Sequence, residues 1–121
     1  FDVLVETLKH ERAFIASNGN SPAKGEFLKH ERSTNTFTKF LELVKDKNLM
    51  SFEEAIKKIT STPALYFDIR DRGIVKEGKV ADLVILGKDD YKIREVILGG
   101  KPCLPASTTV TKGKILRHKA R

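Results

Sequence analysis

The apolar residues of this chain change their spacing near Gly73, and that change limits the folds open to it. Before it, a helix is predicted from Thr36 onward, with an apolar stripe at i, i+3, i+4 and i+7 made by Phe37, Phe40, Leu41 and Val44. After it, short apolar runs at 81–86 and 96–98 are separated by glycines and charged residues, which is typical of strands. Helices followed by strands predict a mixed α/β chain.

The amino-terminal part is predicted to contain a helix end, a buried strand and a loop. Residues 1–8 carry apolar side chains at near-helical spacing, and residues 13–16 form an apolar run that predicts a buried strand. Gly, Asn and Pro in 17–22 supply turn dihedrals, so a loop begins there. The polar segment 24–35 lacks periodicity and is predicted to be an exposed excursion.

Three boundaries have local signals. Ser51 and Glu54 have the spacing of a capping box, which predicts a helix start. Thr62 is predicted to cap a short helix with Pro63 at its first position, where a missing N–H costs nothing. Gly99 and Gly100 predict a hairpin turn, and a final strand is predicted within 110–116.

Charge and cysteine content narrow the class of protein, its partners and its compartment. The net charge is +7, and its excess is a basic tail at Lys101, Lys112, Lys114, Arg117, Lys119 and Arg121. The tail has no aromatic residues to stack on bases, so a solvated tail is favoured over nucleic-acid binding. The sequence shows no apolar run of about 18 residues and no leader, which argues against a membrane partner. The single cysteine, Cys103, fits a cytoplasmic setting.

Five blocks carry a family resemblance. They read FIASNG at 14–19, HERSTNTF at 30–37, the run from Leu49 to Ala64, the run from Arg72 to Val84, and KGKILR at 112–117. In the same order, these blocks are similar to the family patterns I-x-S-D-G, H-P-R-x-Y-G-T-F, L-S-x-E-E-A-I-x-K-x-T-x-x-P-A, R-G-x-I-x-x-G-x-x-A-D-L-V and P-G-R-V-L-R. In order and spacing the chain resembles the N-acyl-D-amino-acid deacylase (D-aminoacylase) branch of the amidohydrolase superfamily.

The resemblance implies the end of a metal-dependent-hydrolase TIM barrel. Residues 1–72 would supply the last strand, a substrate loop and closing helices, and residues 73–121 a small β-sandwich with the basic tail. A whole barrel needs about 250 residues, whereas this chain has 121 and opens at Phe1. We therefore expect the carboxy-terminal portion of a longer protein, which alone is inactive.

The implied chemistry is zinc-dependent hydrolysis of a C–N amide bond, in which a carboxylate after the last barrel strand moves protons. Asn18 stands at the position of that metal-binding, general-base Asp. A carboxamide is uncharged and is no base near neutral pH. The family's metal-binding histidines are also missing here, so zinc is expected in the full-length parent and none is expected to be held by this chain alone.

Asn18 has three open interpretations. It is a natural loss, an engineered inactivating change, or an ordinary turn residue if the alignment slips by a position or two. Two functions follow: part of an amidohydrolase with N-acyl-D-amino-acid deacylase activity, or a catalytically degenerate homologue that acts as a binding or interaction module.

Substrate contacts are implied for the loop after Asn18. Arg32 would pair with the substrate carboxylate, with His30 or Ser33 adding a hydrogen bond. Asp82, inside an apolar run, is instead predicted to accept hydrogen bonds at a strand end. The expected partners are an N-acylated amino acid or similar amide in the parent, and either a second copy or the rest of the enzyme, because barrel pieces expose apolar faces.

Overall fold

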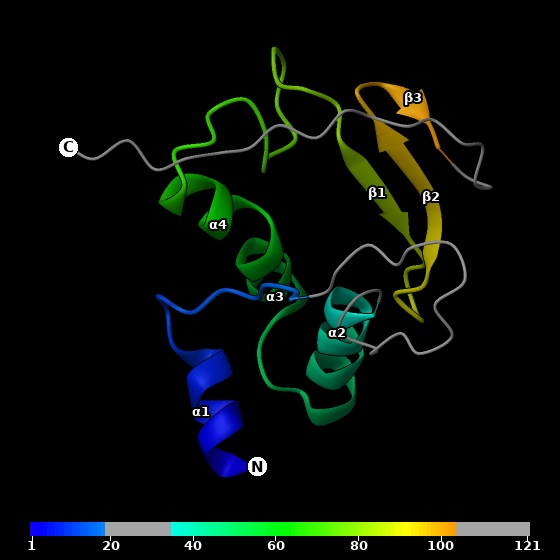
Figure 1. Ribbon diagram of the computed structural model, residues 1–121. Helices are drawn as coiled ribbons and strands as arrows, with labels where there is room; N and C mark the ends of the chain where they lie inside the picture. The colour runs from blue at the N-terminus through cyan, green and yellow to red at the C-terminus, as the bar shows by residue number, and fades with distance from the viewer. Residues whose placement is uncertain (19–34, 104–121) are drawn as a thin grey trace, which may run out of the picture.

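A computed structural model describes residues 1–18 and 35–103 (Figure 1). In chain order its elements are α1 (Asp2–Lys9), α2 (Thr36–Lys47), α3 (Phe52–Ile59), α4 (Ser61–Tyr66), β1 (Leu83–Leu86), β2 (Ile93–Leu98) and β3 (Lys101–Pro102). The predicted change from helices to strands is therefore confirmed. None of the helices in the described ranges has the length and apolar character to cross a bilayer.

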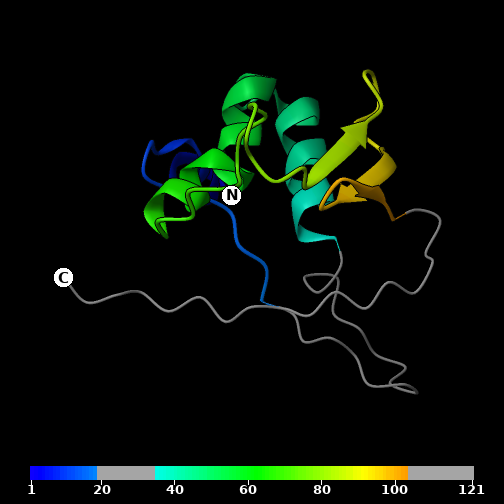
Figure 2. The same ribbon diagram turned by 90° about the horizontal axis from the view of Figure 1, so that it is seen from above.

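The core lies where α2 meets α3, and α2 lies between α3 and the sheet (Figure 2). Its buried members are Phe40, Leu41, Val44 and Ala55. The predicted stripe on α2 is thus correct for three of its positions, while Phe37 remains 41% exposed. Burial of each large side chain here contributes about 1.5–3 kcal/mol to folding.

The start of α3 has the predicted capping box. The Glu54 backbone N–H donates to Ser51 Oγ at 3.2 Å, and the Ser51 backbone N–H donates to Glu54 Oε2 at 3.0 Å. Each side chain thereby binds a backbone N–H that has no partner within the helix. These hydrogen bonds hold the pKa of the Glu54 carboxyl below its usual value.

The predicted cap of α4 at Thr62 is wrong. The residue before α4 is Thr60, and its hydroxyl donates back to the Ile56 carbonyl at 2.6 Å, so α4 begins without a side-chain cap. Pro63 lies at the third helical position, not the first. The structure differs because α4 begins at Ser61, almost directly after the end of α3 at Ile59. Thr62 therefore lies inside α4 and cannot be its N-cap residue.

The strands form one antiparallel sheet in the order β1-β2-β3. The predicted hairpin is present: Leu98 pairs with Lys101, and Gly99 and Gly100 between them both have positive φ, at 56° and 80°. Two successive positive φ values are typical of the turns that match the twist of paired strands. The sheet joins the core through Leu86 and Tyr91, whose ring lies 4.5 Å from that of Phe52.

The predicted strand at 13–16 is not formed, so the described residues do not contain the expected last barrel strand. Residues 13–18 are irregular, and the Ile15 N–H donates to the Lys58 carbonyl at 3.1 Å. A strand exists only where another strand pairs with it, and in the described ranges the strands pair with one another. The polar excursion, apart from Asn35, and the final strand at 110–116 lie outside the described residues.

Gly73 packs directly on α4 and gives a test of this packing. A Cβ at Gly73 would lie 2.5 Å from Ala64 Cβ, whereas a Cβ at Gly78 would meet nothing within 4 Å. Both residues have positive φ, at 89° and 82°, so the backbone strain of an alanine is similar at each. We expect Gly73→Ala to lower the free energy of unfolding by about 1–3 kcal/mol more than Gly78→Ala in denaturant titrations. Equal losses would contradict the contact.

Candidate functional site

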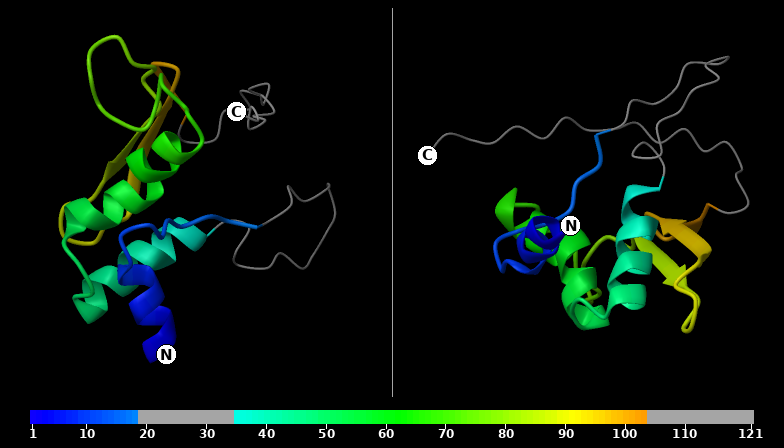
Figure 3. Two further views of the ribbon diagram at one scale, coloured as in Figure 1. Left: turned by 90° about the vertical axis from the view of Figure 1, so that its left-hand side faces the viewer. Right: turned by 90° about the horizontal axis from the view of Figure 1, so that it is seen from below.

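The segment that leads to Asn18 runs from α1 back along α3 (Figure 3). Residues 13–15 are half-buried, and residues 16–18 are exposed. Helix α1 has no fully buried residue, and its Leu8 packs, partly buried, against the core. Asn18 therefore lies at the exposed end of a segment whose position is set by the contacts of residues 8–15.

Lys58 makes the main polar contacts to this segment. Its side chain comes from α3, and its Nζ donates to the His10 carbonyl at 2.6 Å and to the Ala13 carbonyl at 3.0 Å. Lys58 is only 7% exposed, and it is the buried charged residue of the described chain. The sequence analysis did not single it out, although its place three residues after Ala55 puts it on the buried face of α3.

Aromatic contacts hold the same segment against α4. The Phe14 ring centroid lies 5.4 Å from that of Tyr66 and 5.9 Å from that of Phe67. The Tyr66 and Phe67 rings are 5.1 Å apart and nearly perpendicular. Edge-to-face pairs at such distances are favourable, so the segment is fixed by both α3 and α4.

The described residues do not fit a zinc site. No group of three or more His, Cys, Asp or Glu side chains that could hold a metal occurs in ranges 1–18 and 35–103. His10 Nδ1 accepts a hydrogen bond from the Arg12 N–H at 3.2 Å, and Asn18 offers an uncharged amide. The substrate-loop residues His30, Arg32 and Ser33 lie outside the described residues, so their contact with the substrate stays a prediction.

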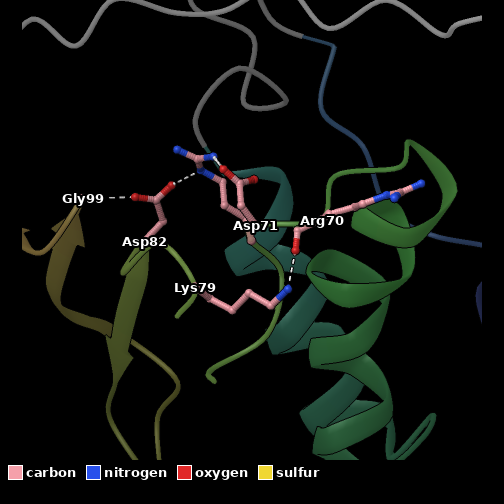
Figure 4. A network of polar contacts seen from close by, with 6 residues as sticks. Arg70, Asp71, Lys79, Asp82 and Gly99 are labelled. Atoms are coloured by element: carbon pink, nitrogen blue, oxygen red, sulfur yellow. Dashed lines mark hydrogen bonds and ion pairs between the residues drawn. The ribbon is translucent and has the colours of Figure 1, made fainter. Parts of the chain in front are cut away.

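A second polar group surrounds Asp82 (Figure 4). Its Oδ1 accepts from the Gly99 N–H at 2.7 Å, and its Oδ2 accepts from Arg72 Nε at 2.7 Å. Arg72 also pairs with Asp71, and Lys79 donates to the Arg70 carbonyl. The Gly99 N–H and then Arg72 hold the pKa of the Asp82 carboxyl below its usual value. The predicted strand-end role of Asp82 is confirmed, because it joins the 70–82 loop to the hairpin turn.

This role predicts a pH-dependent effect of Asp82→Ala. Because the folded-state pKa of Asp82 is lowered, its stabilisation is present above the unfolded pKa of about 3.9 and is lost as pH falls through the folded value. We expect Asp82→Ala to reduce the free energy of unfolding by about 1–2 kcal/mol at neutral pH and by less near pH ~3. Asp89→Ala, which removes an exposed carboxylate beyond the other end of β1, is the control. A loss that does not change with pH would show that the charge is unimportant.

Comparison with known proteins places this geometry in a family. Residues 22–117 match the amidohydrolase family. An N-acyl-D-glutamate deacylase of Alcaligenes xylosoxydans xylosoxydans is 32% identical over 93% of this chain and 26% of its own length. An N-acyl-D-aspartate deacylase of the same organism is 39% identical over 46% of this chain and 11% of its own length. The chain therefore spans about a quarter or less of these relatives.

A solved structure gives the same assignment. The N-acyl-D-glutamate deacylase of Bordetella bronchiseptica, complexed with zinc and a phosphonate inhibitor that mimics the reaction's tetrahedral intermediate, has a TM-score of 0.59 and 27% identity. The similarity covers 74% of this chain and 22% of that chain. The chain belongs to the amidohydrolase family and resembles its D-aminoacylases, and its helices and sheet fit part of an α/β hydrolase.

Proposed function

We propose that this chain forms part of a metal-dependent amidohydrolase that hydrolyses the C–N amide bond of an N-acyl-D-amino acid. The observation that carries the proposal is the deacylase similarity over 93% of the chain. A structural neighbour that is also a deacylase supports it. In this proposal zinc is held by the full-length protein, and residues 1–18 and 35–103 contain no group of side chains that could hold it by themselves.

The proposed architecture is the end of a TIM barrel in 1–72 and β-sandwich strands in 73–121. Exposed apolar side chains on the described strands support a second layer, because Val84 is 54%, Ile85 45% and Ile93 44% exposed. Sandwich sheets bury one apolar face each against a partner sheet. The start of the second unit agrees with the change from helices to strands after Gly73.

The proposed partners are an N-acylated amino acid and either the rest of the enzyme or a second copy. Large apolar side chains are exposed at Leu65, Tyr66 and Val75, by 84%, 68% and 87%. Large apolar side chains exposed to this extent favour contact with other protein surface. Nucleic acid and membrane are not proposed as partners, and the proposed compartment is the cytoplasm.

Asn18 supports a second candidate, a catalytically degenerate homologue that acts as a binding or interaction module. An amide at the proposed general-base position cannot take the proton of an attacking water. Metal analysis of the full-length protein separates the candidates. Tightly bound zinc supports the hydrolase, and a folded protein without metal supports the binding module.

Restoring a carboxylate at Asn18 tests its proposed role. In the full-length protein we expect Asn18→Asp to raise the rate of N-acyl-D-glutamate hydrolysis by about a hundredfold or more, because a general base typically contributes that much. Zinc content should rise or stay unchanged in the same samples. Asn20→Asp adds the same charge two residues away and is the control. Unchanged activity and zinc content in Asn18→Asp would show that Asn18 is not the catalytic position.

Arg32 is proposed to bind the substrate carboxylate. We expect Arg32→Ala to raise KM for N-acylated amino acids more than for uncharged amides, because only the former lose a charge-assisted pair. Steady-state kinetics on both substrate types measure this, in the Asn18→Asp protein where that is the more active form. Arg12→Ala removes an exposed arginine and serves as the control. An equal rise in KM for both substrate types would contradict the binding of the substrate carboxylate by Arg32.

A further inference from the structure

We infer that Lys58 is a positioning residue that fixes the path of residues 10–18 and thereby the place of Asn18. The inference rests on the proposed function in one respect, because the proposed function makes Asn18 part of the site. The contacts of Lys58 themselves do not depend on the proposed function. They join α3 to carbonyls that lie 45 and 48 residues away in the sequence.

The burial of Lys58 makes these contacts restrictive. A buried ammonium is costly unless hydrogen bonds replace its water, and Lys58 is 7% exposed. Its two acceptors, the His10 and Ala13 carbonyls, belong to one turn, in which the Ala13 N–H also donates to the His10 carbonyl at 3.0 Å. If the segment moved away, the ammonium would lose both acceptors, so the turn is held in one place.

A second contact runs in the opposite direction. The Ile15 N–H donates to the Lys58 carbonyl at 3.1 Å, so one residue of α3 binds the segment through both its side chain and its backbone. Asn18 comes three positions after Ile15, which limits Asn18 to within roughly 10 Å of the tether. Neighbouring Lys57 on the same helix is exposed, whereas Lys58 is buried. The two lysines therefore form a matched pair for mutation.

The test uses Lys58→Met and Lys57→Met in the full-length protein, each of which removes one charge. Hydrogen exchange followed by mass spectrometry reports on residues 10–18 and, separately, on α2 and α3. We expect Lys58→Met to speed exchange at the Ile15 amide by about tenfold or more while α2 and α3 keep their protection. Lys57→Met should change neither region. Lys58→Arg keeps a charged donor and should retain most of the protection.

Kinetics give the second readout, in the Asn18→Asp protein. Displacement of the residue at position 18 should lower kcat by about tenfold or more with little change in KM, because orientation affects the chemical step more than binding. Unchanged exchange in 10–18, or an equal increase in 10–18 and in α2 and α3, would overturn the inference. Faster exchange without a change in kcat would also overturn it. If no protein in the series hydrolyses amides, the proposed function fails, and the exchange data still decide whether Lys58 holds the segment.

Discussion

The packing of α2 on α3 is the contact on which the rest of the described chain depends. Ala55 is fully buried, and its small side chain lets Phe40, Leu41 and Val44 approach α3 closely. Ile15 from the amino-terminal segment and Leu86 and Tyr91 from the sheet pack around this centre. The core has few buried members, so each peripheral element has little apolar surface to pack against. Hydrogen bonds such as those of Lys58 and Asp82 also hold these elements in position.

Features encoded within a few residues were predictable from the sequence. The capping box at Ser51 and Glu54, the stripe on α2 and the hairpin at Gly99 and Gly100 all formed as predicted. The stripe is correct except at Phe37, which is exposed. Each feature depends on short-range geometry, such as a side chain that reaches a backbone N–H three residues away. Local signals of this kind need no knowledge of distant partners.

Features that depend on a distant partner were predicted less well. The apolar run at 13–16 reads as a strand, yet its apolar side chains and its backbone pack on α3 and α4 instead of on another strand. Thr62 has a residue type suited to capping, but the position of α4 directly after α3 leaves Thr60 as the boundary residue. Of the candidate site, the sequence placed Asn18 at the end of an apolar segment but gave no sign of how that segment is held.

The block from Leu49 to Ala64, which supports the family resemblance, has structural explanations for several of its residues. Ser51 and Glu54 start α3, and Thr60 binds back to Ile56. Lys58 differs from these, because its contacts leave the helix and hold the segment that carries Asn18. Asp82 also binds a backbone group outside its own segment. It joins the 70–82 loop to the hairpin turn by accepting a hydrogen bond from the Gly99 N–H. In both places one charged side chain binds backbone groups of an irregular segment. Backbone acceptors and donors remain when side chains change, so such anchors keep a loop in position whatever side chains the loop itself carries.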